Sequence, residues 1–258
     1  MAFPNHQDKY NSKPLFSPED LHDYRNVSNI GYGFRVPEHI ILCYAPTLMD
    51  YAAETYSVSA HKMSLGDLYI FNDTSGSVGL MGNFGFGAPV AVTLSEILIA
   101  MGVKRIINTG VAGTLQKHVD IGDIVVCDKA IRDEGTSYHY MKPDIYAYPH
   151  AGLTKKIIET LDRNRMKYFT GPSWTTDAPY RETVAEVSRY QAEGVLTVEM
   201  ETSALFALGN HRNIEVSAIF TISDSLADLE WRPEFHSDKT LKGLETIFEV
   251  SLNTLATC

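Results

Sequence analysis

Apolar residues occur along this chain in two patterns, and the patterns alternate from residue 38 onward. Short apolar runs predict buried strands, and these runs cover 40–44, 68–71, 78–81, 105–108, 124–127, 166–170, 195–200 and 215–222. Apolar residues spaced by three and four predict helices, and these cover 47–55, 89–101, 151–163, 181–192, 201–209 and 239–255. Such alternation predicts an α/β fold, a single three-layer domain with a central mixed β-sheet flanked by helices.

The beginning of the chain lacks this alternating pattern of apolar runs and helical spacing. Residues 1–36 are polar and irregular, with several prolines. Ser17 precedes Pro18 and two acidic residues, and this order predicts a helix start because serine caps a helix and acids favour its first turn. No repeat or linker interrupts residues 38–258. We therefore expect an N-terminal arm over 1–36 and one folded domain over 37–258.

Charge and cysteine content narrow the class of protein. The formal net charge of −10 disfavours a broad nucleic-acid surface and binding to anionic membranes. Three distant cysteines indicate neither a disulfide framework nor a zinc site, and nine scattered histidines show no metal-ligand spacing. No apolar run reaches the ~18 residues of a membrane span, and no signal peptide is recognisable. We expect a cytoplasmic protein without a metal.

Small residues follow two of the predicted strands. Gly85-Phe86-Gly87-Ala88-Pro89 lies between a strand and a helix, and Asn108-Thr109-Gly110-Val111-Ala112-Gly113 follows another strand. In open α/β sheets, ligands bind outside the carboxyl ends of the strands, where small residues leave room. Each segment taken alone is equally typical of a tight turn.

Carboxylates end two other predicted strands. Glu199 and Glu201 flank Met200 at the end of one strand, and Asp224 follows the apolar run of another. Buried acids are costly unless they are paired or used in chemistry. Asp224 is placed for acid–base work. A helix-capping or ion-pair role remains an alternative for Glu199 and Asp224.

The combination of these segments resembles a known enzyme family. The matching segments occur in order, and they are INTGVAG (107–113), GDIVV (122–126), VEME (198–201) and ISD (222–224). They are similar to the nucleoside phosphorylase family, which includes uridine phosphorylase, hexameric purine nucleoside phosphorylase and methylthioadenosine nucleosidase. The resemblance covers roughly residues 38–255. Residues 130–137 resemble the uridine phosphorylase branch.

The resemblance implies an enzyme that cleaves the N-glycosidic bond of a nucleoside. It places Glu201 on the ribose 2′-hydroxyl, Met200 beneath the sugar and Glu199 beside them. A carboxylate there favours the positive charge that develops on the sugar in an oxocarbenium-like transition state. The resemblance also implies a homo-oligomer, either a dimer or a trimer of dimers, with no organic cofactor.

The base is expected at the second acidic strand end. By resemblance, Asp224 protonates purine N7, which requires a pKa raised by burial. The pyrimidine branch lacks this Ser-Asp pattern, so Asp224 favours a purine. Residues 173–181 align with the family's base-pocket loop, where Trp174 or Tyr180 is expected to stack. The expected base-binding residues are Ala112, Gly113, Trp174, Tyr180, Arg181 and Asp224.

The phosphate site departs from the family pattern. The phosphorylases hold phosphate with a Gly-Asp-Pro-x-Arg turn, which reads Tyr44-Ala45-Pro46-Thr47-Leu48 here. Asn108 replaces a second arginine, and Val111 replaces a hydroxyl residue. Each hydrogen bond to a charged group contributes roughly 1.5–3 kcal/mol, so these losses should weaken phosphate binding strongly. The expected degenerate anion site consists of Leu48, Lys62, Gly85, Asn108, Thr109 and Val111.

Three functional hypotheses remain open at this point. The missing arginines slightly favour hydrolysis over phosphorolysis of a purine nucleoside, with phosphate the less favoured co-substrate. The uridine-like segment 130–137 leaves phosphorolysis of a pyrimidine nucleoside as an alternative. Because fold does not fix function, a non-catalytic nucleoside-binding or storage protein is a third. In each case residues 225–238 are expected to form a lid over the base.

Overall fold

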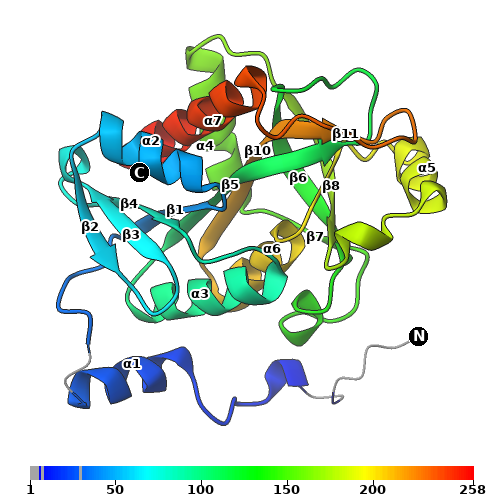
Figure 1. Cartoon of the computed structure of the whole chain (residues 1–258). Coiled ribbons are helices and arrows are strands. Elements are labelled where there is room, and N and C mark those ends of the chain that lie inside the picture. Colours follow the sequence, from blue (N-terminus) through cyan, green and yellow to red (C-terminus); the bar gives the residue numbers. More distant parts are fainter. Residues whose placement is uncertain (1–5, 7–8, 29–30) are drawn as a thin grey trace.

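A computed structural model gives the fold of the chain (Figure 1). It describes residues 6, 9–28 and 31–258. Part of the expected N-terminal arm, at positions 1–5, 7–8 and 29–30, lies outside the described residues. The rest of the arm runs along one side of the folded domain, as the blue helix α1 shows in Figure 1.

The arm contains η1 (Lys9–Asn11) and α1 (Pro18–Val27). The sequence predicted the start of α1 correctly, since Ser17 and Asp20 form a reciprocal cap. The Asp20 amide donates to the Ser17 hydroxyl at 3.2 Å, and the Ser17 amide donates to the Asp20 carboxylate at 2.7 Å. No residue of α1 is buried. Glu19 pairs with Arg212 of the domain, so the arm rests on the domain rather than contributing to its core.

The strands of the described residues form one sheet of eleven. They are β1 (His39–Cys43), β2 (Val58–Lys62), β3 (Asp67–Phe71), β4 (Val78–Gly82), β5 (Arg105–Thr114), β6 (Ile124–Asp133), β7 (Tyr146–Ala147), β8 (Phe169–Thr176), β9 (Thr197–Glu199), β10 (Glu215–Ser225) and β11 (Arg232–Pro233). Their order is β11-β10-β6-β8-β9-β5-β1-β4-β3-β2, with β7 beside β6. Because β10 also pairs with β5, five of the strands close into a ring.

The sheet is mixed, as the sequence predicted. β1 pairs in parallel with β4 and β5, and β5 pairs in parallel with β10. Antiparallel pairs join β3 to β2 and β4, and β10 to β6. The parallel register brings the carboxyl ends of β1, β5 and β10 to one edge of the sheet, which is where ligands bind in such sheets.

Helices cover both faces of the sheet, which confirms the three-layer prediction (Figure 1). They are α2 (Pro46–Thr55), α3 (Ala88–Ala100), α4 (Ala151–Arg163), α5 (Val184–Ala192), α6 (Thr202–Arg212) and α7 (Asp238–Ala256). α3 packs against α6 on one face, whereas α7 packs against α2 and α4 on the other. Each face therefore buries its own apolar cluster against the shared strands.

The structure differs from the sequence prediction in the extent of the strands. β5, β6 and β8 continue several residues beyond the predicted ends, and the exposed strand β2 was not predicted. The predicted helix over 181–192 begins only at Val184, after a 3-10 turn, η4 (Pro179–Arg181). Within the part of the chain that the structure describes, no helix is long and apolar enough to cross a membrane.

Candidate active site

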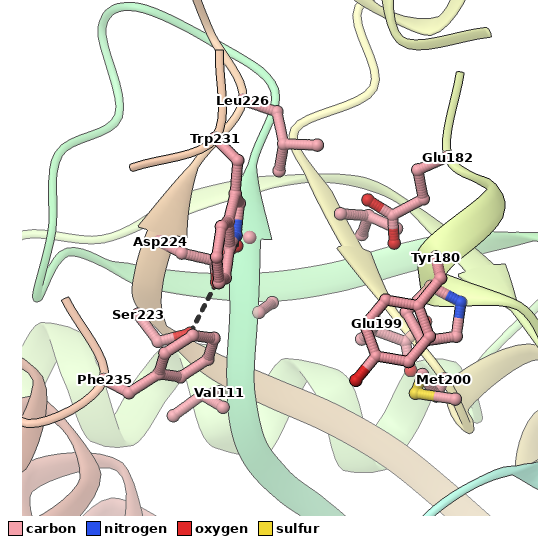
Figure 2. A pocket seen from close by; sticks show the side chains of 14 residues that line it. Val111, Tyr180, Glu182, Glu199, Met200, Ser223, Asp224, Leu226, Trp231 and Phe235 are labelled. Carbon is pink, nitrogen blue, oxygen red and sulfur yellow. Dashed lines mark hydrogen bonds between the residues drawn. The ribbon is translucent and has the colours of Figure 1, made fainter. Parts of the chain in front are cut away.

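A cavity of about 500 Å³ opens where β5, β9 and β10 end (Figure 2). Within the described part of the chain, its lining combines apolar residues with three carboxylic acids and no lysine or arginine. The lining residues are Val111, Ala112, Gly113, Pro179, Tyr180, Glu182, Val198, Glu199, Met200, Ser223, Asp224, Leu226, Trp231 and Phe235. An apolar cavity with a few convergent polar groups is the usual form of a small-molecule site.

Asp224 presents a buried carboxyl to this cavity. The pairing of β10 with β5 shifts register between Ile222 and Asp224, which places Ser223 in a bulge. The Ser223 hydroxyl donates to Asp224 Oδ1 at 2.8 Å, and the Trp231 indole N–H donates to Oδ2 at 3.0 Å. Only 8% of Asp224 is exposed. Burial raises the pKa of Asp224, although these two hydrogen bonds act in the opposite direction.

Aromatic and apolar side chains form two walls of the cavity. Trp231 and Phe235 lie on the same side as Asp224, and their rings are 6.2 Å apart (Figure 2). Tyr180 and Met200 lie on the opposite side (Figure 2). Trp231 and Phe235 come from the segment predicted to act as a lid, and both remain partly exposed. A flat ring fits between walls of this kind.

Glu182 is a further acid of the cavity, and the sequence gave no reason to select it. It follows η4 directly, its side chain is half-buried, and it lies across the cavity from Asp224 (Figure 2). Burial raises the pKa of Glu182 to about 7, and the negative charges of Asp224 and Glu186 add to this effect. Its only sequence signal was its position beside the predicted base-pocket loop.

The carboxylate of Glu199 accepts hydrogen bonds from other residues of the protein. Its Oε1 accepts from the Thr175 hydroxyl at 2.5 Å and from the Ser173 hydroxyl at 3.2 Å. Its Oε2 accepts from the amides of Glu201 and Thr202 and from the Thr202 hydroxyl, at 2.6–2.9 Å. These amides begin α6, so the carboxylate of Glu199 caps that helix. Burial raises the pKa of Glu199, with the hydrogen bonds acting against it.

Glu201 lies behind the cavity rather than among its lining residues. Its Oε1 accepts from the Gly87 amide at 2.5 Å, and only 7% of the residue is exposed. Burial raises the pKa of Glu201 to about 8, and the charge of Glu199 contributes. Gly87 adopts φ +100°, a left-handed conformation that favours glycine, and this aims its amide at the carboxyl.

A chain of hydrogen bonds connects the first strand end to these acids. The Tyr44 hydroxyl donates to Asn108 Oδ1 at 2.7 Å. Asn108 Nδ2 donates to the Thr202 hydroxyl at 3.0 Å, and Thr202 in turn donates to Glu199. The Tyr44 ring lies within van der Waals reach of Gly110. Tyr44 and Asn108, two of the positions at which the sequence was expected to depart from a phosphate site, therefore bond to each other.

Comparison with known proteins shows to which family the chain belongs. A family model described as the phosphorylase superfamily matches residues 40–255. The chain belongs to the phosphorylase superfamily. Similar proteins include a guanosine phosphorylase of Halorubrum lacusprofundi, 30% identical over 55% of this chain and 59% of that protein. A DeoD-type purine nucleoside phosphorylase of Bacillus cereus is 28% identical over 74% of this chain and 83% of the relative.

Solved structures agree with this assignment of the superfamily. Uridine phosphorylase from Vibrio fischeri superposes with a TM-score of 0.75 at 25% identity, covering 87% of this chain and 94% of that one. Purine nucleoside phosphorylase from Toxoplasma gondii has the same TM-score at 17% identity, over 86% and 92% of the two chains, and shows the shared fold. The relatives of this superfamily member are thus nucleoside phosphorylases, which transfer glycosyl groups.

The structure gathers only some of the residues expected to bind the base. Ala112, Gly113, Tyr180 and Asp224 line the cavity. Trp174 does not, and its expected stacking role is corrected: it is 1% exposed and packs against Tyr190 in the core. Its indole N–H donates to Asp133 at 2.9 Å. Because side chains alternate along a strand, Trp174 points to the face of β8 that is turned away from the cavity. The sequence pattern did not show which face this residue would take.

Arg181 and the two acids expected near the ribose, Glu199 and Glu201, also depart from the expected arrangement. Arg181 is exposed on η4 and lies outside the residues that line the cavity. Met200 lines the cavity, as expected of a residue beneath the sugar. Glu199 lines the cavity, and its oxygens already accept five hydrogen bonds from the protein, so its expected ribose contact stays a prediction.

The residues of the expected anion site do not form a cationic cluster. Leu48 is 2% exposed in the core, and Lys62 pairs with Asp67 at 2.7 Å on the exposed strand β2. Thr109 faces Ser251 of α7 at 3.4 Å. Val111 lines the cavity, and Gly85 adopts φ +90° with open space around it. In the described residues, no group of three His, Cys, Asp or Glu could hold a metal ion.

Proposed function

We propose that this protein cleaves the N-glycosidic bond of a purine nucleoside, with water as the acceptor of the sugar. The observation that carries the proposal is the Asp224 carboxyl, which is buried, has a raised pKa and faces a cavity of about 500 Å³. A general acid needs such a pKa to carry a proton near neutral pH. Two similar proteins are named purine nucleoside phosphorylase and guanosine phosphorylase, which supports a purine.

The reaction divides between the two ends of the cavity. As the bond between C1′ and N9 breaks, its electron pair passes to the base and Asp224 delivers a proton to N7, so the base leaves neutral. Positive charge develops on the sugar, and the carboxylate form of Glu201 stabilises it. Water adds to C1′ and releases a proton to solvent, and the Asp224 carboxylate takes up a proton from solvent before the next turnover. The aromatic walls hold the base in the plane that Asp224 can reach.

Water is favoured over phosphate because of the charge around the cavity. The lining holds Glu182, Glu199 and Asp224 and no basic residue. Phosphate is an anion, and phosphate sites ordinarily use arginine forks or clustered amides. By the resemblance noted in the sequence, Asn108 stands in place of an arginine of the phosphate site. Both ends of its side-chain amide are already hydrogen-bonded, to Tyr44 and to Thr202. A phosphate would meet acids and an apolar Val111.

Phosphorolysis is the second candidate, and two observations favour it. The named relatives and structural neighbours are phosphorylases of guanosine, purine nucleosides and uridine. The open space and left-handed backbone at Gly85 leave amides near the site to which an anion could bind.

The test is base release from a panel of purine and pyrimidine nucleosides, with and without phosphate. We expect free ribose and a free purine, at a rate that phosphate does not change. Formation of ribose 1-phosphate that requires phosphate would establish the second candidate instead. Release from uridine alone would replace the purine with a pyrimidine. Binding without release of any base would indicate a nucleoside-binding protein.

A further inference from the structure

The chain between β10 and β11 forms a hairpin that carries an indole to the buried acid. Ser225 of β10 pairs antiparallel with Arg232 of β11, and residues 226–231 connect them. Trp231, at the end of this connection, donates its indole N–H to Asp224 Oδ2 at 3.0 Å. Because 63% of Trp231 is exposed, packing in a core does not fix the position of its ring. The position of this donor therefore depends on what holds hairpin 225–232 in place.

A glutamine of α5 supports the first turn of this hairpin. Gln191 Nε2 donates to the backbone carbonyl of Ala227 at 3.1 Å and to that of Leu226 at 3.5 Å. Ala227 is buried, and a buried carbonyl needs a donor. The turn ends at Leu229, which adopts φ +61°, a left-handed conformation that is unfavourable for leucine. Such a turn depends on support from outside its own residues.

A second glutamine fixes the position of the first. Gln116 Nε2 donates to the backbone carbonyls of Gln191 at 3.1 Å and of Val195 at 2.9 Å. The backbone amide of Gln116 donates to the Thr114 hydroxyl at 3.1 Å, at the end of β5. Neither glutamine is among the described residues that line the cavity. Gln116 and Gln191 thus connect β5, α5 and the hairpin from outside the cavity.

Ion pairs act on the same hairpin but provide less support. Asp228 pairs with Lys117 at 2.9 Å and with Arg232 at 3.3 Å. These side chains are 46–76% exposed, so solvent and salt screen their attraction. The hydrogen bonds from Gln191 join neutral groups, one of them buried, and salt does not screen them in this way. We therefore regard the glutamine as the main support of the hairpin turn.

The helix that carries Gln191 also follows directly on the opposite wall of the cavity. Tyr180 and Glu182 precede α5 and lie across the cavity from Trp231 (Figure 2). Val187 of α5 belongs to the apolar cluster against which Leu226 packs. The side chain of Gln191 therefore spans from one wall of the cavity to the base of the other, so it can set the distance between them.

We propose that Gln191 is a positioning residue of the active site, which holds hairpin 225–232 against α5 so that the Trp231 indole stays bonded to Asp224. In treating Asp224 as the acid, this inference rests on the proposed function. Without the Gln191 donor, the hairpin turn should shift and the bond from Trp231 to Asp224 should weaken. Because that bond lowers the pKa of Asp224, its loss raises this pKa.

The variant that tests this role removes the donor and keeps the length of the side chain. Gln191→Met does so and retains a good helix former. Ala185→Met, at an exposed position of α5, is the matched control. Other ionisable groups face Asp224 or the hairpin, and both variants leave them unchanged. They are Glu182 across the cavity, Glu199 of β9, Lys117 after β5, and Asp228 and Arg232 of the hairpin.

Tryptophan emission of the whole protein, titrated with pH, reports on the bond between Trp231 and Asp224 without any substrate. Protonation of a carboxyl that contacts an indole changes the emission of that indole. Trp174 also donates to an acid, Asp133, so the relevant step is the one that Trp231→Phe and Asp224→Asn both remove. We expect Gln191→Met to move this step to higher pH and Ala185→Met to leave it in place.

Steady-state kinetics add a second readout that a purely structural role would not change. Gln191→Met should raise KM for the best nucleoside by about 2- to 10-fold, the range that one hydrogen bond between neutral groups supplies. It should also move the alkaline limb of kcat/KM to higher pH. In a Trp231→Phe background, the same substitution should move that limb no further, because the bond through which it acts is already absent.

Each result decides for or against the role of Gln191. An emission step at the wild-type pH in folded Gln191→Met overturns it, even if the variant is less stable. Equal shifts of the kinetic limb with and without Trp231 overturn it as well. A shifted emission step in a protein that releases no base leaves the role standing and removes the proposed function. If Gln191→Met does not fold, Gln191→Asn, whose shorter side chain reaches less far, should move the step in the same direction, and an unmoved step overturns the role.

Discussion

At the scale of the residue, the acids at the cavity differ in role: some are held by hydrogen bonds within the protein, and others face the space where a ligand would bind. Glu199 is saturated by donors, Glu201 is held by Gly87, and Asp224 keeps a raised pKa while facing the cavity. Asp224 and Met200 could be selected from the sequence, because both end apolar strands within a recognisable motif. Glu182 could not, because a glutamate in a polar segment is ordinarily a solvated side chain.

Asp224→Asn should abolish most of the cleavage and leave binding nearly intact. The amide keeps the shape of the carboxyl but cannot deliver a proton to the base, and a general acid typically contributes 10²–10⁴-fold. Steady-state rates and calorimetric affinity for the best nucleoside would check this. Full activity in the variant would remove Asp224 from the mechanism.

Trp231→Phe should extend activity to higher pH. The indole hydrogen bond lowers the pKa of Asp224, so its loss raises that pKa, and the protonated acid persists further into the alkaline range. The alkaline limb of kcat/KM is expected to move to higher pH. Phe235→Leu, which removes an aromatic ring without removing a donor to Asp224, should leave the limb in place. An identical profile for wild type and Trp231→Phe would contradict this role.

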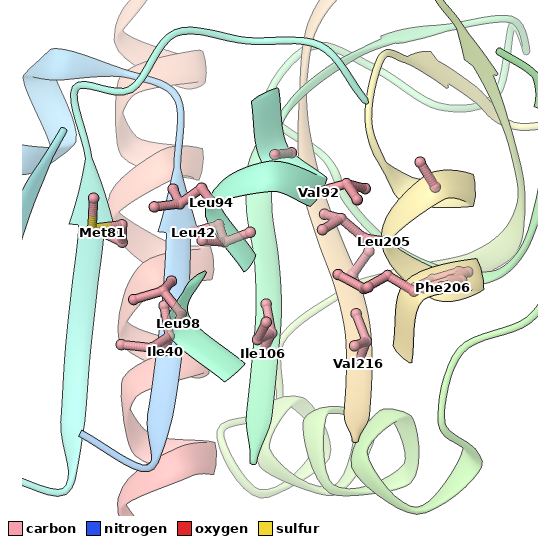
Figure 3. Packing of buried hydrophobic residues seen from close by; sticks show 14 of the residues in the cluster. Ile40, Leu42, Met81, Val92, Leu94, Leu98, Ile106, Leu205, Phe206 and Val216 are labelled. Atoms are coloured by element: carbon pink, nitrogen blue, oxygen red, sulfur yellow. The ribbon is translucent and has the colours of Figure 1, made fainter. Parts of the chain in front are cut away.

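At the scale of the element, apolar periodicity predicted where strands and helices lie better than where they end. Leu94 and Leu98 of α3 lie beside Leu42 and Ile40 of β1, and Val92 of α3 lies beside Leu205 of α6 (Figure 3). The helical spacing of apolar residues in α3 reflects these repeated contacts. β5 runs on through Asn108 to Thr114 because its small residues still pair with β10. This pairing joins residues that are far apart in the sequence, so it produces no local pattern of apolar residues from which the end of β5 could be predicted. Strand β2 was missed because its residues are mostly exposed.

The start of α6 depends on Glu199, and this dependence gives an element-scale prediction. Glu199→Ala should lower the free energy of unfolding by at least about 3 kcal/mol, because it leaves buried amides and hydroxyls without an acceptor. Denaturant unfolding measures the change. Val184→Ala, an exposed position on α5, is the control and should stay within about 0.5 kcal/mol. Reduced nucleoside affinity with unchanged stability would instead restore the ribose role expected from the sequence.

At the scale of the whole molecule, the three layers follow from the alternation of strands and helices, and this part of the prediction was confirmed. The ring formed by β5, β9, β8, β6 and β10 did not follow, because the β10–β5 pairing joins strands about a hundred residues apart. That pairing places Ala112 and Gly113 beside Asp224, so the cavity owes its position to a contact that no local pattern contains.

Removal of residues 1–28 should leave the domain folded. α1 buries none of its residues, and its Glu19–Arg212 ion pair contributes no more than about 1 kcal/mol. Thermal unfolding of the truncated and whole chains should show one cooperative transition each, a few degrees apart. Loss of the transition would mean that the arm completes the core. The position of Val36, the first buried residue among those described, argues against this outcome.

The hydrogen bonds among Tyr44, Asn108, Thr202 and Glu199 have a consequence for how this site can evolve. A mutation that introduces arginine at position 108 alone would strip Tyr44 and Thr202 of their shared partner and would force a cation into space that a tyrosine ring already fills. Tyr44 would have to shrink in the same lineage before the arginine brought any benefit. A change toward an arginine-based site is therefore blocked one step at a time, and descendants of this chain are expected to retain Tyr44 and Asn108 together or to lose them together.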